Sequence, residues 1–233
     1  MAQRPVFSPA AASGLVDEPM VEFEWFPGFA VVQKQRSIDS LHAAVADALG
    51  LERILEVSTK SPEQLGVRLS AFNLAVELDG EPSPVLLEAA FQGSKVFETQ
   101  GPFTHLYGVQ DGRAVKRFMK ELPEDRLVGF QLSGHDWSLS PKTALYDWLY
   151  LNGLRRLINE DERVADVLSN YEAFTDIEFN PAKSINCQAR SCALYLSLLR
   201  NGTLNDALSD PTAFVEVLTS NGYGIEPSQG QLL

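Results

Sequence analysis

The sequence predicts one globular domain in which α-helices and β-strands are mixed. Its 233 residues fit a single large domain. Apolar residues make up 45% of the chain and charged residues 21%, which are the proportions of an ordinary globular protein. Segments with the apolar period of a helix stand beside shorter segments that alternate as strands do. No internal repeat or low-complexity linker divides the sequence, so one domain is expected.

The first part of the chain is expected to begin with a loose arm at residues 1–19, which are rich in Ala, Ser and Pro. Val21–Trp25 then alternates apolar with acidic residues, a pattern typical of a strand. Ser37 is a good helix cap and Gly50 a good helix terminator, so a helix is expected between them. The other elements expected before residue 80 are strands at residues 30–33, 54–59 and 66–78.

The next segment, residues 83–97, is predicted to be a helix around which the rest of the chain packs. It is apolar on nearly all sides, which is typical of a buried helix. Glu88, Gln92 and Lys95 interrupt it at positions i, i+4 and i+7, so a helix would place them on one face. A buried carboxylate and amine cost free energy unless they face a cavity, a partner or each other. The pair is therefore either structural or directed at a ligand.

A short basic helix is expected over residues 113–122. Arg113, Lys116, Arg117 and Lys120 would form a positive stripe along it. Such a stripe is either an ordinary solvated face or a local contact for phosphate groups. The elements expected after it are a strand at 127–132, helices at 141–159, 164–168, 184–201 and 211–220, a short strand or irregular segment at 174–179, and a loose tail at 223–233.

Charge and composition exclude several classes of protein. A net charge of −12 weighs against a broad grip on nucleic acid, although it leaves room for a local basic pocket. Two cysteines without a secretory signal, and no apolar run of membrane-spanning length, favour a soluble cytoplasmic protein. The three histidines lack metal-ligand spacing and no Gly-rich phosphate loop is present, so neither a metal nor a cofactor is indicated.

Several phrases of the sequence resemble a known family. Leu69–Leu74, then Gly80, then a helix with Glu88 and Lys95 seven residues apart, is similar to the pattern of the NADAR (YbiA-like) family. Two positions depart from the wider pattern, with Ala71 where the family usually has Asn and Ala89 where it has His. The phrases that most closely resemble the DarT-associated NADAR antitoxins are Trp25–Phe29, Phe91–Phe97, Lys142–Trp148 and Phe174–Arg190.

The resemblance covers roughly residues 20–205 and implies a fold, an activity and partners. The fold would be α+β and helix-dominated, a multi-helical NADAR-like domain at residues 20–222 with small peripheral strands. The activity would be that of an N-glycosidase, which removes ADP-ribose from guanine bases in DNA as the antitoxin of a DarT-type toxin. The implied partners are ADP-ribosylated DNA and the cognate toxin, with no membrane.

The resemblance also implies roles for particular residues. Glu88 would move a proton during cleavage of the N-glycosidic bond. Lys95 would either form a Schiff base with the ring-opened sugar, helped by a pKa that burial lowers, or act as a simple charge partner. Arg190 is preferred to Arg200 as the contact for the diphosphate. The implied substrate-binding residues are Ser70, Phe72, Asn73, Gln92, Trp137, Asp176, Asn186 and Arg190, of which Phe72 and Trp137 could stack on a base.

Two other functions stay open on the sequence. A non-catalytic module could bind ADP-ribose, or could neutralise a basic toxin through its acidic surface, because complementary charge speeds association. A metabolic N-glycosidase acting on a riboflavin-pathway intermediate is the other alternative, and the antitoxin-like phrases weigh against it.

Overall fold

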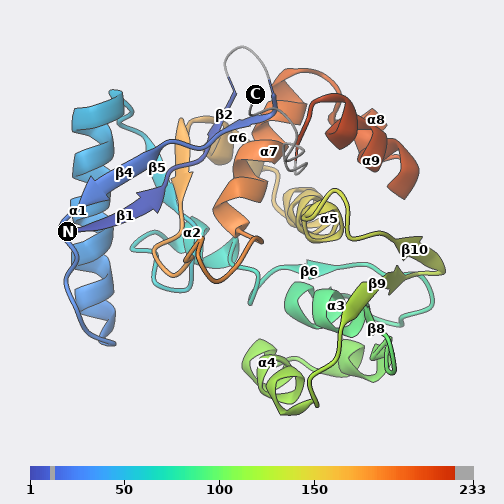
Figure 1. Cartoon of the computed structure of the whole chain (residues 1–233). Helices are drawn as coiled ribbons and strands as arrows, with labels where there is room; N and C mark the ends of the chain where they lie inside the picture. The colour runs from blue at the N-terminus through green and yellow to red at the C-terminus, as the bar shows by residue number, and fades with distance from the viewer. Residues whose placement is uncertain (11–13, 224–233) are drawn as a thin grey trace, which may run out of the picture.

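Small β-sheets of two or three strands lie among the α-helices in the computed structural model, which describes residues 1–10 and 14–223 (Figure 1). The three-stranded sheet is antiparallel, in the order β10 (His135–Trp137), β9 (Leu127–Leu132), β8 (Lys95–Phe97). Each of the other sheets in the described ranges has two strands. The predicted α+β class, with helices dominant and strands small, is confirmed.

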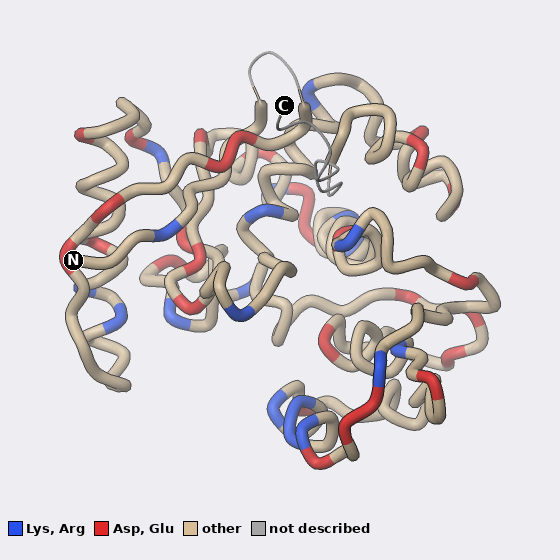
Figure 2. The backbone as a smooth tube through the Cα atoms, in the orientation of Figure 1, with Lys and Arg blue, Asp and Glu red and all other residues tan. Residues whose placement is uncertain are grey.

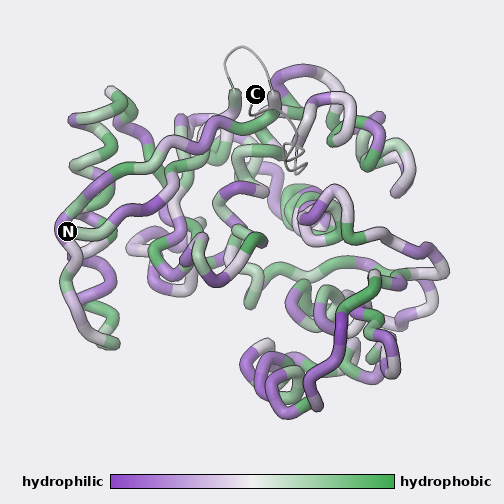
Figure 3. Tube along the Cα trace, in the orientation of Figure 1, coloured by the Kyte–Doolittle hydropathy of each residue, from purple (hydrophilic) through white to green (hydrophobic). Residues whose placement is uncertain are grey.

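The main hydrophobic core surrounds two long helices, α5 (Ala144–Glu160) and α7 (Gln188–Arg200). Their inward faces are almost wholly apolar, and Tyr150 on α5 is fully buried. Figure 3 shows hydrophobic residues concentrated along α5, in the middle of the molecule. Burial of apolar surface stabilises a fold by about 25 cal/mol per Å². This core is therefore the main source of stability.

The N-terminal residues are part of the fold, so the expected loose arm at residues 1–19 is wrong for the described part of that segment. β1 (Ala2–Pro5) pairs with β4 (Met20–Phe23), and β2 (Ser8–Pro9) pairs with β3 (Val16–Asp17). Between β1 and β2, the Val6 and Phe7 side chains are 0% and 2% exposed. The prediction of a loose arm relied on the Ala, Ser and Pro content and overlooked this apolar pair. Val6 and Phe7 anchor the segment to the rest of the fold.

The helix next to this sheet, α1 (Val31–Leu49), begins earlier than expected. The strand expected at residues 30–33 is instead its first turn. Ile38, Leu41 and Val45 follow the 3.6-residue period and pack beneath the sheet as a second, smaller core. Gly50 ends the helix in the left-handed conformation, with φ of 68°, as the sequence predicts.

Residues 54–86 hold less strand than expected. β5 (Ile54–Glu56) pairs in parallel with β11 (Ala173–Thr175). The strand expected at 66–78 is wrong for most of its length: it is replaced by the end of α2 (Gln64–Arg68), a turn, and β6 (Ala75–Val76), which pairs with β7 (Val85–Leu86). The Ser70 carbonyl accepts the N–H groups of both Asn73 and Leu74, so the backbone here closes into a turn.

The helix expected to carry both Glu88 and Lys95 is broken. α3 (Leu87–Gly93) carries Glu88, but Lys95 begins strand β8. The Gly93 backbone is so close to Tyr107 that a Cβ atom would stand 2.5 Å from its ring. The Ser94 hydroxyl then donates to the Phe91 carbonyl at 2.8 Å and closes the helix end. The prediction of one shared helix face is therefore wrong.

The second half of the chain matches the predicted pattern more closely. α5 and α7 appear where helices were expected, although α7 begins at Gln188 rather than Ser184. Of the expected tail, Tyr223 is buried, and residues 224–233 lie outside the described residues. Within the described ranges, no helix combines the length and apolarity that crossing a membrane requires. The remaining elements are η1 (Thr104–Gly108), α4 (Gly112–Glu121), α6 (Arg163–Ser169), α8 (Leu204–Ala207) and α9 (Pro211–Ser220).

Candidate active site

The Glu88 carboxylate is the centre of the candidate site. It lies in the first turn of α3 and is only 4% exposed. Its Oε1 accepts a hydrogen bond from Gln92 Nε2 at 2.9 Å, and its Oε2 lies 3.7 Å from Lys116 Nζ on α4. A buried carboxylate needs such partners, because its desolvation is otherwise unfavourable. Glu88 and Gln92 lie on one face of α3, as the spacing predicts, and are hydrogen-bonded, whereas Lys116 is a partner that the sequence analysis did not assign.

Lys95 is half-buried at the start of strand β8, where the charge of Glu88 acts on its amine. Its Nζ lies 5.2 Å from the centroid of the Phe91 ring. Burial lowers the pKa of the Lys95 amine, the negative charge of Glu88 opposes this shift, and the positive charge of Lys116 adds to it. The net direction is downward, so a larger fraction of this amine is neutral near pH 7 than in an ordinary lysine.

Lys116 is held in place by an aromatic ring and by a glycine. Its Nζ lies 4.5 Å from the centroid of Phe72, a cation–π contact. Gly112, at the start of α4, permits the close approach, because a Cβ there would lie 2.6 Å from the Phe72 ring and 3.4 Å from Glu88 Cβ. Figure 2 shows lysine and arginine gathered on α4. The sequence identified the stripe but did not predict that Lys116 turns towards Glu88.

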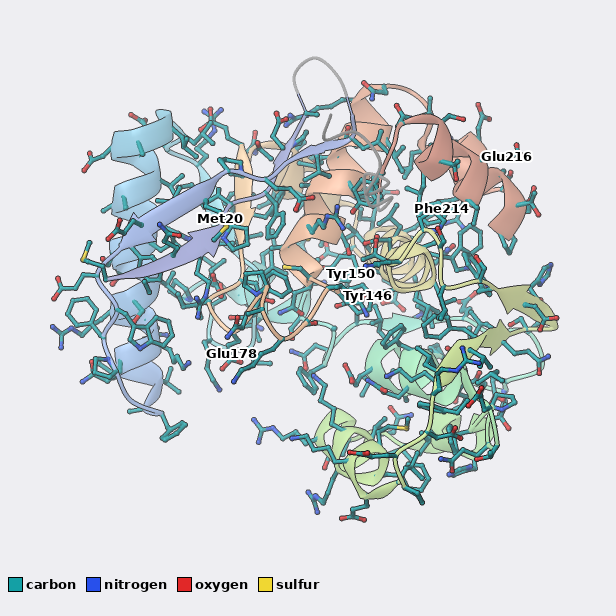
Figure 4. The ribbon with its side chains drawn as sticks, in the orientation of Figure 1. Met20, Tyr146, Tyr150, Glu178, Phe214 and Glu216 are labelled. Carbon is teal, nitrogen blue, oxygen red and sulfur yellow. The ribbon has the colours of Figure 1, made fainter. Side chains whose placement is uncertain are left out.

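A cavity of about 530 Å³ opens beside these residues. Its walls are the Phe72–Asn73 turn, the start of α4 at Asp111–Arg113, Thr59–Lys60 and Glu178. Figure 4 labels Glu178 in the loop that follows β11. The volume lies within the usual range for ligand sites, roughly 300–1,000 Å³. Phe72 and Gly112 both line the cavity and contact the Glu88 cluster, so a bound ligand would lie close to it.

Asp176 and Gln188 tie two walls of this cavity together. The Asp176 carboxylate accepts the Glu178 and Phe179 N–H groups at 3.0 and 3.1 Å. It also accepts from Gln188 Nε2 at 3.0 Å, and Gln188 Oε1 accepts the Ala71 N–H at 2.8 Å. The loop after β11 and the turn that carries Phe72 are thus fixed relative to each other. Asp176 therefore holds two walls of the cavity in place although it does not line the cavity itself.

Glu56, at the end of β5, is a second buried carboxyl that the sequence analysis missed. Its oxygens accept from the Ser58 hydroxyl at 2.6 Å, the Thr175 hydroxyl at 2.7 Å and the Ile177 N–H at 2.9 Å. Burial raises the pKa of Glu56, and repulsion from Asp176 raises it further. Burial likewise raises the pKa of Asp176. The sequence did contain a sign of this buried carboxyl, because Glu56 lies directly after two apolar residues of an expected strand.

A family model matches most of the chain. The family model described as the DarT1-associated NADAR antitoxin matches residues 2–224. The chain belongs to this family. The matched range includes residues 2–10, whose strands pack against the domain. Among curated proteins, no match to the chain is found.

Within this NADAR antitoxin, the predicted site residues before residue 100 gather near Glu88 or the cavity. Phe72 and Asn73 line the cavity, and the Asn73 side chain donates to the Val67 carbonyl at 2.7 Å. Ser70 is fully buried, and its hydroxyl accepts the Phe72 N–H at 3.4 Å. Ser70 thus supports the Phe72 turn from inside, and no open surface presents it to a ligand.

Trp137 lies elsewhere in the NADAR antitoxin. It is 5% exposed and packs against Trp148, with ring centroids 5.7 Å apart. In the three-stranded sheet Trp137 pairs with Phe130, and Phe130 pairs with Lys95. Trp137 and Lys95 therefore share a sheet face with Phe130 between them. Trp137 does not line the cavity beside Glu88; with Trp148 it lines a separate cavity of about 360 Å³, and its stacking on a base stays a prediction.

Asn186 and Arg190 do not line the cavity beside Glu88. Arg190 Nε donates to Glu18 Oε1 at 2.5 Å, and its guanidinium lies 4.3 Å from the Tyr223 ring centroid. Arg190 faces a different cavity of about 640 Å³, next to the N-terminal strands. The Asn186 side-chain oxygen is buried without a hydrogen-bond partner among the described residues. Within residues 1–10 and 14–223, no group of three or more His, Cys, Asp or Glu side chains could hold a metal ion.

Proposed function

We propose that this NADAR antitoxin is an N-glycosidase that removes ADP-ribose from guanine bases in DNA modified by a DarT-type toxin. The observation that carries the proposal is the half-buried Lys95 amine, whose pKa is lowered, and the buried Glu88 carboxylate that acts on it, close to Phe72 and Gly112 in the wall of a ligand-sized cavity. An amine with a lowered pKa is a nucleophile, and a carboxylate beside it can move protons. Cleavage of an N-glycosidic bond to ribose through a Schiff base uses both functions.

The proposed reaction exchanges one nitrogen for another at C1″ of the ribose. The ribose ring first opens: the C1″–O4″ bond breaks, Glu88 moves the proton of the guanine nitrogen to O4″, and C1″ becomes doubly bonded to that nitrogen. The Lys95 amine then adds to C1″, and the bond from C1″ to the guanine nitrogen breaks as the Schiff base to Lys95 forms. Glu88 takes the proton that Lys95 loses and delivers it to the departing nitrogen. Water then hydrolyses the Schiff base on Lys95, which releases ADP-ribose and restores the amine. No oxidant or reductant is needed for these steps.

The charge distribution supports a nucleic-acid substrate. The chain carries a net charge of −12, yet Arg113, Arg117 and Lys120 are exposed together on α4, beside the cavity. Lys60 lines the same cavity. Local cations of this kind suit the phosphates that flank a modified base, since phosphate contacts dominate nucleic-acid affinity. The broad acidic surface limits the contact to this region.

The proposal is tested with a DNA oligonucleotide that carries ADP-ribose on guanine. Protein at one-hundredth of the substrate concentration is added, and mass analysis follows the modified and unmodified DNA. We expect complete conversion by the native chain and at least a hundredfold slower conversion by Glu88→Gln. Glu124→Gln, an exposed carboxylate change outside the site, should behave as the native chain. If toxin is silenced only by equimolar protein and no ADP-ribose is released, the chain is a binding module and the enzymatic proposal is wrong.

A further inference from the structure

Two lysines of different exposure interact electrostatically with the Glu88 carboxylate. Lys116 Nζ lies 3.7 Å from Glu88 Oε2, and the two side chains are 48% and 5% exposed. Lys95 is more deeply enclosed, lying against Phe91 on a strand of the three-stranded sheet. A carboxylate between two lysines can favour a proton on either one. The lysine with better access to water keeps its charge at lower cost, so burial disfavours the charged form more at Lys95 than at Lys116.

The position of Lys116 is built into the fold. The Phe72 ring holds its ammonium from one side, and Gly112 lets α4 approach α3 closely. Lys116 also lies on the inner edge of the basic stripe, so the same helix reaches both Glu88 and solvent. A positive charge fixed next to a second amine is a known way to make that amine a nucleophile near neutral pH.

We propose that Lys116 is a positioning residue that favours the neutral form of Lys95, because it pairs with the Glu88 carboxylate and brings a positive charge into the surroundings that Glu88 and Lys95 share. The catalytic consequence rests on the proposed function, whereas the electrostatic effect on Lys95 does not. Among the described residues, the charges that act on Lys95 are those of Glu88 from α3 and Lys116 from α4. The neighbouring strand β9 presents uncharged Phe130 opposite Lys95.

The first test is a pH profile of kcat/KM on ADP-ribosylated DNA. Lys116→Gln removes the charge, so Lys95 should hold its proton to higher pH and the acid limb of the profile should move up by about one pH unit. Activity at pH 7 should then fall about tenfold and recover towards the native value at high pH. Lys116→Arg should keep the native profile. A loss of rate that is equal at every pH would indicate a merely structural role and would overturn the proposal.

Lys120→Gln is the matched control for charge. It removes the same positive charge one turn further along α4, where the side chain is exposed. We expect the acid limb to stay in its native position, even where KM for DNA rises. If Lys120→Gln moves the limb as far as Lys116→Gln does, a general change in surface charge explains the effect and Lys116 has no special position.

A second measurement does not depend on turnover. The lysines are reductively methylated with ¹³C-formaldehyde, and the methyl signal of Lys95 is assigned from its absence in Lys95→Arg and titrated by NMR. The Lys95 pKa should be higher in Lys116→Gln than in the native chain and unchanged in Lys120→Gln. If it stays the same in Lys116→Gln, the inference fails even where DNA turnover is normal. If it shifts but no turnover exists, only the proposed function fails.

Discussion

Two clusters of buried ionisable groups offset the free-energy cost of burying charge in different ways. The Glu88 cluster sets one carboxylate against two lysines, Lys95 and Lys116, and one of these lysines reaches solvent. The Glu56–Asp176 cluster sets two carboxyls close together and surrounds them with hydrogen-bond donors from the backbone, hydroxyls and an amide. Burial raises the pKa of Tyr146 on α5, and the charges of Glu88, Cys187 and Asp176 add to the shift, so this tyrosine responds to both clusters (Figure 4).

The difference separates a reactive site from a structural one. In the Glu88 cluster, opposite charges compensate burial and leave one amine with a lowered pKa. In the Glu56–Asp176 cluster, burial raises the pKa of both acids, so protonation rather than a cation relieves the cost. The second cluster fixes the loops at Thr59–Lys60 and Glu178 that line the cavity. One cluster is thus suited to chemistry and the other to holding the cavity in shape.

The largest expected effect comes from Lys95. Lys95→Arg keeps a positive charge but cannot supply a neutral amine, because arginine stays protonated. Turnover should fall by at least about a hundredfold, and borohydride added during turnover should leave an ADP-ribose adduct on Lys95 of the native chain. Peptide mass spectrometry detects the adduct. Absence of an adduct, together with near-native activity of Lys95→Arg, would make Lys95 an electrostatic partner only and would remove the contrast between the two clusters.

A smaller effect is expected where α4 meets the Glu88 cluster. Gly112→Ala adds a Cβ that would stand 2.6 Å from the Phe72 ring, so the ring must move and carry Lys116 with it. We expect kcat/KM to fall about tenfold, because a small misplacement near reacting groups is costly. The control is Gly108→Ala, where a Cβ meets no atom within 4 Å. If both variants keep native activity, the close approach of α4 has no bearing on the reaction.

The sequence predicts the helices better than the site. α4, α5, α7 and α9 have caps or apolar periods that depend on neighbouring residues alone, and the structure has helices at these places. The break between α3 and β8 depends on the contact of Gly93 with Tyr107, which is distant in sequence. Strand pairing in the N-terminal segment likewise depends on partners elsewhere in the chain. Local patterns cannot report such contacts.

The site residues also divide into those placed by local sequence and those placed by contacts between distant segments. Glu88 and Gln92 lie one helical turn apart, and the structure pairs them as expected. Lys116 reaches Glu88 from another helix, and Gln188 links Asp176 to Ala71 across more than one hundred residues of sequence. The environment of Arg190, which pairs with Glu18, depends on an N-terminal segment that composition alone describes as loose. Contacts between distant segments decided these outcomes.

The acid cluster predicts a pH dependence of stability. Burial raises the pKa of Glu56 from 4.5 to about 8, so between these pH values the folded state holds a proton that the unfolded state has lost. The free energy of unfolding should therefore fall as pH rises through this window, by at most about 1.4 kcal/mol per pH unit for each carboxyl. Glu56→Gln should make the fall shallower, as measured by denaturant unfolding at several pH values.

The control for this pH dependence is Glu22→Gln, an exposed carboxylate on β4. It should leave the slope as in the native chain. A slope in Glu56→Gln equal to that of the native chain would show that Glu56 contributes nothing to it, and Asp176, whose pKa burial also raises, would then account for the pH dependence. Protonation of Glu56 would then no longer distinguish the two clusters in how they offset the cost of burying a carboxylate.

The smallest expected effect concerns the outer side of α4. Arg117 and Lys120 are exposed, whereas Lys116 points to Glu88, so reversing Arg117 and Lys120 to Glu removes cations without disturbing the cluster. KM for ADP-ribosylated DNA should rise several-fold, because phosphate contacts that favour binding are lost. The salt dependence should also become weaker, since each lost contact removes about 0.7–0.9 from the slope of log affinity against log salt concentration. The matched control reverses Lys34 and Arg36 on α1, which lie against Trp25 and Phe26. If both double variants raise KM and change the salt slope equally, net charge alone explains the effect. If only the α4 variant does so, the helix that carries Lys116 into the site also guides the phosphates towards it.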